Sequence, residues 1–387
     1  MRELKQLDTA VQIIKNANQN QPFANSLSQY FRQNKQMGSR DRRLYSELCY
    51  SNFRIGKSIL NASVEEKIIA GYFLINQIPS DFLQAVAPDL NEEISKSIED
   101  KFEIIRARHS EFNPLLIYQF KTPFSDSIDP LAFSISHLIK PLVFLRVDVN
   151  YSEKINLKLK ELEITHFQLS ETCIAVEPIT QLEPLRQAGI KFEVQDLSSQ
   201  YTGTYFKPEA HERWWDCCAG SGGKSLLIHS LEPEIKLLVS DMRETILENL
   251  KERFQLAGIS KYQLKEIDLM NNFDAQMPGY EFDGIILDAP CSGSGTWGRA
   301  PEMLTFFDEN KIKMYNHLQF TIAKNISKYL MIGKPLIYIT CSVFKQENET
   351  MIEKIAKELA YTIEKFELIK GYHNRADSMF VARLIKN

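Results

Sequence analysis

The chain has 387 residues, of which 44% are apolar and 25% charged, so it can form the cores of two or three globular domains. Its net charge of −4 argues against a protein that coats nucleic acid non-specifically, and no run approaches the roughly 18 apolar residues of a membrane span, which predicts a cytoplasmic protein without membrane contact. Six scattered cysteines, without paired C-x-x-C motifs or Cys/His clusters at zinc spacing, argue against a disulfide framework, indicate a reducing compartment and predict no metal site.

The first third of the chain has the pattern of helices. Apolar side chains recur there at three- and four-residue spacing, which predicts an all-α domain over residues 1–130. Its first 60 residues hold ten lysines and arginines but four acids, although the whole chain is acidic. This asymmetry indicates that this end binds a polyanion, and the alternative is a solvated helical face. The segment 122–130, "TPFSDSIDP", is typical of a linker.

Shorter elements follow over residues 131–205. A β-rich run at 142–149 precedes a helical pattern at 152–162, and two further runs, "THFQLS" and "TCIAVEP", are typical of strands. A β-α-β-β beginning within about 60 residues predicts a small ferredoxin-like or RRM-like α+β module.

Residues 206–387 alternate strands with helices, which predicts a doubly wound α/β domain with a mostly parallel sheet. In such a sheet, ligands bind outside the carboxyl ends of the strands. The expected strands are 213–218, 235–241, 263–268, 282–289 and 335–342, and the expected helices are 224–231, 242–257, 309–332 and 346–359.

A glycine-rich turn, "DCCAGSGGKS", follows the first of these strands and opens a helix. Its glycines allow a tight turn and a close approach of the backbone to a ligand, and the helix start offers free N–H groups. A Walker P-loop is excluded because Cys218 stands where that motif needs glycine. The residues that we expect to line a cofactor here are Cys218, Ala219, Gly220, Ser221, Gly222, Gly223 and Lys224.

Acidic residues end three successive strands around this turn. Asp241 ends the strand after the glycines, where a carboxylate accepts the ribose hydroxyls of an adenosine cofactor. Asp268 ends the following strand, near the expected adenine, and Asp216 ends the first. Each aspartate alone is more often a cap or turn residue, but the three together favour a nucleoside cofactor. The spacing fits S-adenosylmethionine as well as NAD.

Two cysteines end two other strands. Cys291 lies in "DAPCSGSG" and Cys341 in "TCS", both at the predicted ligand edge of the sheet. A thiolate is a strong nucleophile where its surroundings lower its pKa. The alternative is that both thiols are small buried hydrophobes, the usual role of free cysteine.

These motifs resemble those of the NOL/NOP/Sun family of RNA cytosine-5 methyltransferases. The loop from Asp288 to Gly295 matches the family's "DAPCSGxG" throughout, and Arg299 and Pro301 fit as well. The segment around Cys341 matches the family's "Y-x-T-C-S…E-N-E", and Glu347, Asn348 and Glu349 form the last part of that match. The glycine-rich turn also matches the family, with departures at Gly220, Ser221 and Ser225. Near the C-terminus, Ser378, Met379 and Phe380 replace the family's Gly-Phe-Phe. Residues 41–55 are similar to the NusB-like RNA-binding domain of bacterial 16S rRNA methyltransferases of the Sun/Fmu type.

The resemblance implies a Rossmann-like class I methyltransferase domain with a seven-stranded sheet, S-adenosylmethionine as cofactor, and RNA, foremost 16S rRNA, as substrate. It implies that Cys341 attacks C6 of cytosine, that Cys291 assists release, and that Asp288 acts at N3 and also lines the cofactor site. Lys224 would orient Asp288. The flanking aromatic residues Tyr201, Phe206, Trp297 and Phe306 are candidates for stacking on bases.

Other functions stay open at this point. They are a tRNA cytosine-5 methyltransferase, a catalytically silent RNA-binding factor with the same fold, and a DNA cytosine methyltransferase, in which Cys291 would be the nucleophile. An NAD-dependent dehydrogenase is the last alternative, but no motif in the sequence supplies the hydride chemistry that it would need. We expect a monomer that does not act on DNA.

Overall fold

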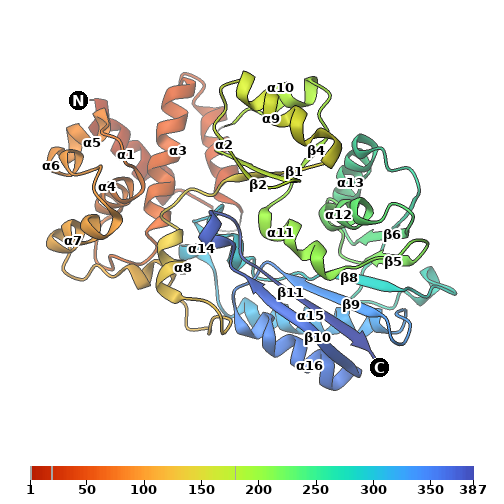
Figure 1. Ribbon diagram of the computed structural model, residues 1–387. Coiled ribbons are helices and arrows are strands. Elements are labelled where there is room, and N and C mark those ends of the chain that lie inside the picture. The colour runs from red at the N-terminus through yellow and green to blue at the C-terminus, as the bar shows by residue number, and fades with distance from the viewer. Residues whose placement is uncertain (1, 19–20, 179) are drawn as a thin grey trace. The chain divides into compact units, whose positions relative to one another are not determined.

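The computed structural model describes residues 2–18, 21–178 and 180–387. The chain divides into two compact units (Figure 1). We call the first the helical unit; it contains the chain up to residue 121 together with residues 129–140 and 296–309. The second, the sheet unit, contains residues 122–128, 141–295 and 310–387. The division into three domains at residues 130 and 205 stays a prediction.

The helical unit fits the all-α region expected from the periodicity, and its likeness to NusB stays a prediction. Arg54, at the end of α3, is buried and donates to the carbonyl oxygens of His137 (2.8 Å) and Gly298 (3.0 Å). The Phe53 ring packs edge-on against Phe306 at 5.3 Å. These contacts attach two distant segments to the main helical body. Its helices are α1 (Arg2–Lys15), α2 (Phe23–Gln33), α3 (Ser39–Arg54), α4 (Val64–Ile75), α5 (Asp81–Val86), α6 (Pro88–Glu92), α7 (Ile98–Arg108), η1 (Pro114–Tyr118), α8 (Pro130–Ser136) and α14 (Met303–Phe306).

A four-stranded antiparallel sheet in the order β2-β3-β1-β4 forms the first part of the sheet unit. This is the strand order of a ferredoxin-like module. One face of β1 and β3 packs under two helices through Leu145 and Ile174, and the other face buries Phe144 and Ala175 beside Ala376. The face on which RRM proteins stack bases is therefore closed here. The elements are β1 (Val143–Val147), η2 (Val149–Tyr151), α9 (Ser152–Glu161), β2 (His166–Ser170), β3 (Cys173–Val176), α10 (Glu183–Gln187) and β4 (Phe192–Val194).

The large sheet has seven strands in the order β10-β11-β9-β8-β5-β6-β7. Strands β5 to β9 are parallel, β11 pairs antiparallel with β9, and β10 pairs antiparallel with β11. This confirms the predicted doubly wound α/β fold. The strands are β5 (Arg213–Asp216), β6 (Lys236–Asp241), β7 (Tyr262–Glu266), β8 (Gly284–Asp288), β9 (Pro335–Thr340), β10 (Tyr361–Ile369) and β11 (Met379–Lys386).

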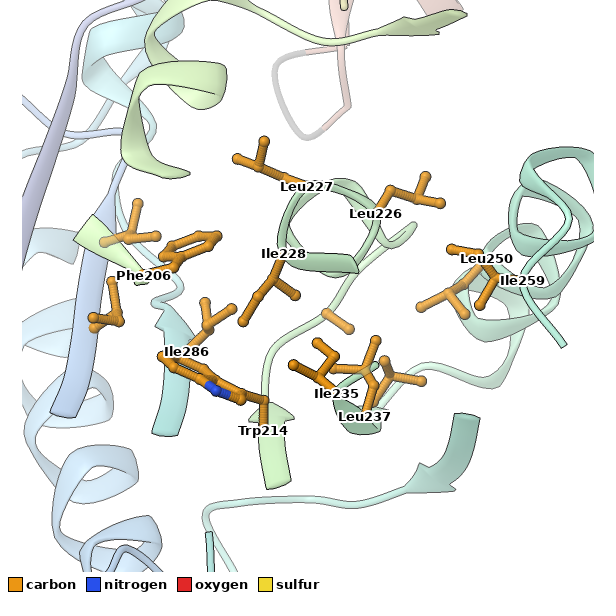
Figure 2. Packing of buried hydrophobic residues seen from close by; sticks show 14 of the residues in the cluster. Phe206, Trp214, Leu226, Leu227, Ile228, Ile235, Leu237, Leu250, Ile259 and Ile286 are labelled. Atoms are coloured by element: carbon orange, nitrogen blue, oxygen red, sulfur yellow. The ribbon is translucent and has the colours of Figure 1, made fainter. Parts of the chain in front are cut away.

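Helices cover both faces of this sheet (Figure 1). On one face, Ile228 of α12 and Leu250 of α13 pack with Trp214 of β5 and Ile286 of β8 (Figure 2). After β5 the chain runs outward through β6 and β7 and then returns to place β8 and β9 on the other side of β5. The reversal puts the expected ligand crevice at the carboxyl ends of β5 and β8. The helices are α11 (Leu197–Tyr201), η3 (Thr202–Tyr205), α12 (Gly223–Leu231), α13 (Glu244–Ala257), η4 (Asp274–Gln276), η5 (Ser294–Thr296), α15 (Lys311–Ser327), η6 (Lys345–Glu347), α16 (Glu349–Leu359) and η7 (Gly371–Asn374). In the part of the chain that the structure describes, none of the helices combines the length and apolarity needed to cross a bilayer.

Two segments differ from their sequence interpretation. The helix expected over 309–332 ends at Ser327, because the chain turns there and Leu330 pairs with Phe282 beside β8. The segment 122–128, expected to be a linker, is part of the sheet unit, where the backbone N–H of Ser125 donates to the Val343 carbonyl oxygen at 2.8 Å. It therefore supports the loop that follows β9.

A buried serine hydroxyl predicts an unusual stability effect. Ser378 is fully buried, and its Oγ has no hydrogen-bond partner among the described residues. Because an unpaired buried hydroxyl is unfavourable, we expect Ser378→Ala to raise the free energy of unfolding by about 1 kcal/mol, measured by urea titration. The control is Ser225→Ala, which removes a hydroxyl that donates to Asp216 at 2.5 Å and should destabilise the protein. A lower unfolding midpoint for Ser378→Ala would contradict this prediction.

Candidate active site

The two candidate thiols lie side by side at the carboxyl edge of the large sheet. Strand β8 ends at Asp288, three residues before Cys291, and β9 ends at Thr340, directly before Cys341. Because β8 and β9 pair in parallel, their following loops leave the sheet together. The structure places the Sγ atoms of Cys291 and Cys341 3.4 Å apart, within hydrogen-bond distance.

The Cys291 thiol keeps its proton more strongly than an ordinary cysteine does. The hydrogen bond to Cys341, burial and the negative charges of Cys341 and Glu347 raise the pKa of the Cys291 thiol well above its ordinary value. This favours Cys291 as the donor of the hydrogen bond between the two sulfur atoms. A thiol that keeps its proton is a poor nucleophile, because the thiolate is the nucleophilic form of cysteine.

An ion pair lies at the end of β8. Lys224, from the first turn of α12, places its Nζ 3.0 Å from Oδ2 of Asp288, and only 7% of the lysine side chain is exposed. The same ammonium group donates to Ser199 Oγ at 2.9 Å. Sequence reasoning paired Lys224 with Asp288 by resemblance but missed Ser199, which lies in α11, 25 positions before the lysine. A single small polar residue in a short helix carries no sequence signal for this contact.

The glycine-rich turn leaves room for a ligand along its backbone. A Cβ added at Gly220 or Gly223 would meet no atom within 4 Å, so the backbone there borders open space. Gly220 and Gly222 have positive φ angles of +52° and +87°, which favour glycine. At Gly222 an added Cβ would come within 3.0 Å of Leu250 and Phe254, so this glycine also permits helix packing.

The remaining residues of the turn are held by neighbouring elements. Ala219 donates its N–H to the Ser240 carbonyl oxygen at 2.9 Å, which attaches the turn to β6. Ser221 is turned toward α13, where its carbonyl oxygen and Oγ accept from Arg253 at 2.8 and 2.9 Å. Cys218 is half-buried.

Asp241 lies at the end of β6, beside this turn, and is 7% exposed. Its carboxylate accepts from the Gly220 N–H at 3.0 Å and pairs with Arg243, whose N–H and Nε donate to it at 3.0 Å each. Burial opposes ionisation, but these donors outweigh it and lower the pKa of Asp241. Arg243 was not foreseen from the sequence. Asp268 lies two residues beyond β7 and accepts from the Met270 N–H at 2.9 Å, as a turn residue does.

Asp216, at the end of β5, is fully buried. Burial raises the pKa of its carboxyl to about 7, although the Ser225 hydroxyl donates to Oδ2. Oδ1 has no hydrogen-bond partner among the described residues. A carboxyl with one unpaired oxygen in such a site favours its protonated form.

This pKa predicts a pH-dependent effect of Asp216→Asn. The folded-state pKa, about 7, is above the ordinary 3.8, so the stabilising contribution of the bound proton is complete below pH 3.8 and is lost as pH rises through 7. We expect the wild type to lose on the order of 2 kcal/mol relative to Asp216→Asn between pH 5 and pH 8. Urea unfolding of both proteins at the two pH values measures this difference. A difference that does not change with pH would show that Asp216 is ionised throughout.

Of the aromatic residues proposed for base stacking, Phe206 is fully buried in the hydrophobic core, so its proposed role was wrong. Trp297 stacks on Tyr118 within the helical unit at 5.4 Å, and Phe306 packs there as described. Tyr201 is 45% exposed and stays a candidate. No group of three His, Cys, Asp or Glu residues in the described ranges has the arrangement of a metal site.

Comparisons with solved structures support the fold. The protein of the crystal structure of PH0851 superposes with a TM-score of 0.69 and 18% identity, covering 99% of this chain and 98% of that one. NSun6 from Pyrococcus horikoshii, in a crystal structure with SFG, has a TM-score of 0.56 and 16% identity, covering 66% of this chain and 95% of that one. At these identities the likeness establishes the fold alone.

Comparisons of sequence find relatives among rRNA methyltransferases. The "Ribosomal RNA small subunit methyltransferase B" of Shewanella oneidensis is 33% identical over 208 residues, which are 50% of this chain and 47% of that protein. The chain thus matches about half the length of this relative. The "Probable ribosomal RNA small subunit methyltransferase B" of Coxiella burnetii is 27% identical over 84% of both chains.

The family model of the 16S rRNA methyltransferases RsmB/F matches residues 203–384. This range contains the glycine-rich turn, both thiols, six strands of the large sheet and most of the seventh, β11. The resemblance inferred from the motifs is confirmed. Residues 203–384, just under half of the chain, are thus similar to the RsmB/F methyltransferases.

Proposed function

We propose that this chain transfers a methyl group from S-adenosylmethionine to C5 of a cytosine in RNA, with 16S rRNA as the substrate. The observation that carries the proposal is the contact between Cys291 and Cys341, whose sulfur atoms lie 3.4 Å apart at the carboxyl edge of the sheet. Methylation at C5 needs one nucleophile that adds to the ring and a second group that removes the C5 proton, so that the enzyme is released from the product. Two thiols in contact, beside a carboxylate and a glycine-rich turn, are suited to this division of roles.

Cys341 is the nucleophile in this proposal. Cytosine C5 is too weakly nucleophilic to take a methyl group directly. The Cys341 thiolate forms a bond to C6, and the electron pair of the C5–C6 double bond makes C5 nucleophilic. Asp288, held by Lys224, shares a proton with N3 and so accommodates the charge that develops on the ring. The cofactor, when bound, supplies the electrophilic methyl group.

Cys291 acts after the transfer, when C5 carries both the methyl group and its original proton. Bond formation converts Cys341 to a neutral thioether. This removes two causes of the raised pKa of Cys291, namely the hydrogen bond to Cys341 and the Cys341 charge. Cys291 then ionises more easily and takes the C5 proton. The electron pair of the broken C–H bond restores the C5–C6 double bond and expels the Cys341 thiolate.

The cofactor would be held by the glycine-rich turn and by carboxylates. The open backbone at Gly220 and Gly223 fits the close approach of a ligand. Asp241, ionised and beside Gly220, fits ribose hydroxyls, and we keep Asp268 near the adenine and Asp288 near the transferred methyl group. NSun6, solved with SFG, an analogue of S-adenosylmethionine, shares this fold. The part of the turn that we assign to the cofactor comprises Cys218, Ala219, Gly220, Ser221, Gly222, Gly223 and Lys224.

Ribosomal RNA is the preferred substrate for two reasons. The relatives from Shewanella oneidensis and Coxiella burnetii bear the name of a small-subunit rRNA methyltransferase, and the first 60 residues carry a surplus of basic side chains. The DNA-type mechanism would need Cys291 as the attacking thiolate. The raised pKa of Cys291 argues against that role.

Methyl transfer is tested with labelled S-adenosylmethionine and purified protein on 16S rRNA, isolated small ribosomal subunits, tRNA and single-stranded DNA. Mass spectrometry of the digested nucleosides should find 5-methylcytidine in a 16S rRNA substrate. If the label is found in tRNA alone, the substrate is tRNA and not 16S rRNA. Tight RNA binding without 5-methylcytidine in any RNA would favour the silent binding factor.

A further inference from the structure

A buried carboxylate is bonded to the two thiol loops; its charge helps to raise the pKa of Cys291, but it carries no chemical step in the mechanism above. Glu347, at the end of η6, is fully buried. Its Oε2 accepts from Ser292 Oγ at 2.5 Å and from Ser342 Oγ at 2.6 Å. Its Oε1 accepts from the Ser292 N–H at 2.9 Å and from Gln319 Nε2 at 3.1 Å. Each of these serines directly follows one of the two cysteines, so one carboxylate is bonded to both loops.

All four of these hydrogen-bond partners of Glu347 are neutral groups. Burial of a charged carboxylate is costly, and hydrogen bonds from neutral donors only offset that cost. A buried carboxylate is therefore weak evidence for a stabilising role. What an apolar residue would not supply is a fixed, directional link between a loop after β8 and a loop after β9.

The next residue holds the loop that follows β9. Asn348 accepts from Thr340 Oγ1 at 2.6 Å and donates its Nδ2 to the Ser342 carbonyl oxygen at 2.9 Å. Ser292 Oγ also lies 3.2 Å from Ser342 Oγ. The loops are therefore linked to each other as well as to Glu347.

We propose that Glu347 is a positioning residue, which uses Ser292 and Ser342 to hold the Cys291 and Cys341 sulfur atoms in contact. The catalytic meaning of this role rests on the proposed function, but the geometric claim does not. Displacements of about 1 Å at a reacting group can cost on the order of 100-fold in rate. Ser292 and Glu347 are 55 positions apart in the sequence, so only the folded chain brings them together.

The geometric claim is tested without any methyl transfer. Diamide oxidises two neighbouring thiols to a disulfide and takes up their two hydrogen atoms, so the rate of Cys291–Cys341 disulfide formation reports the contact between the sulfur atoms. Peptide mass spectrometry separates this disulfide from those of other cysteines. We expect Glu347→Gln to slow its formation at least tenfold, because the amide replaces one oxygen acceptor with a donor. The matched control is Glu349→Gln, two positions on, whose carboxylate accepts from Ser125 Oγ at 3.0 Å and should leave the rate unchanged.

A second variant covers the case in which Glu347→Gln does not fold, as judged by circular dichroism. Ser342→Ala removes one donor to Glu347 and should slow disulfide formation as well. In the double variant, the two substitutions should slow the reaction by less than the product of their separate effects, because they break the same link. Wild-type rates in a folded Glu347→Gln or Ser342→Ala protein would overturn the proposal.

The methyl-transfer assay supplies the catalytic readout. Glu347→Gln should lower kcat on rRNA at least tenfold and leave KM for rRNA unchanged, because Glu347 affects the thiols rather than RNA binding. If the wild type makes no 5-methylcytidine while Glu347→Gln still slows disulfide formation, the proposed function fails and the positioning role stands. If Glu347→Gln and the wild type have equal kcat values on an RNA that the wild type methylates, the link has no catalytic role.

Discussion

Replacement of Cys341 by alanine is expected to abolish methyl transfer and covalent RNA capture, whereas replacement of Cys291 by alanine is expected to accumulate a covalent protein–RNA adduct. The thiols touch, yet their environments differ. The raised pKa of Cys291 keeps a proton on it and so favours Cys341 as the thiol that forms the bond. Without Cys291, the bond still forms and the methyl group is transferred, but the C5 proton is removed slowly. Loss of a positioned general base typically costs about 10²- to 10⁴-fold in rate.

The adduct is measured as a band of reduced mobility on a denaturing gel and by the mass of the digested conjugate. The control is Cys173→Ala, which removes a buried thiol of the small sheet and should neither trap RNA nor abolish transfer. Adduct formation by Cys341→Ala instead of Cys291→Ala would invert the roles of the two thiols and give the order expected of a DNA-type enzyme. If neither Cys291→Ala nor Cys341→Ala forms an adduct with an RNA that the wild type methylates, a covalent route is contradicted.

The parallel part of the large sheet was predictable because its signals are local. Runs such as 335–340 are buried along their whole length, as central parallel strands require, and each is followed by a helical pattern. Strands β10 and β11 were not located in advance. Strand β10 lies at the sheet edge and consists mostly of exposed and half-buried residues, including Glu364, Lys365 and Glu367, so its sequence lacks the apolar run of a central strand.

Contacts between distant segments explain what sequence reasoning missed at the site. The likeness of 288–295 and 340–349 to family motifs indicated the two thiols, but nothing local shows that Glu347 bonds to Ser292, 55 positions away. The same holds for Ser199 beside Lys224. Residues 296–309 belong to the helical unit through contacts such as Arg54 with Gly298, which are 244 positions apart. Pairings of this kind depend on the folded chain and leave no periodic pattern.

Asp241→Ala is expected to weaken S-adenosylmethionine binding by about 30- to 100-fold, because it removes a charged acceptor worth about 2 to 3 kcal/mol in hydrogen bonds to ribose hydroxyls. The structure favours this role because the Asp241 carboxylate is held by the Gly220 N–H and by Arg243, which keep it ionised beside the glycine-rich turn. Its lowered pKa also means that affinity should be constant from neutral pH down to about pH 5 and fall only when the carboxylate is protonated. Isothermal titration calorimetry with S-adenosylmethionine measures both effects.

The matched control uses a carboxylate at the opposite end of the same sheet. Asp283 directly precedes β8, accepts from the Arg213 N–H at 2.9 Å and pairs with Lys334 at 3.1 Å. Since cofactors bind at the carboxyl ends of parallel strands, Asp283→Asn should leave the affinity unchanged even if it lowers stability. Equal losses of affinity in both variants would indicate general destabilisation. An unchanged affinity in folded Asp241→Ala would show that Asp241 only braces the turn through Gly220 and Arg243, and the search for the ribose-binding carboxylate would move to Asp268.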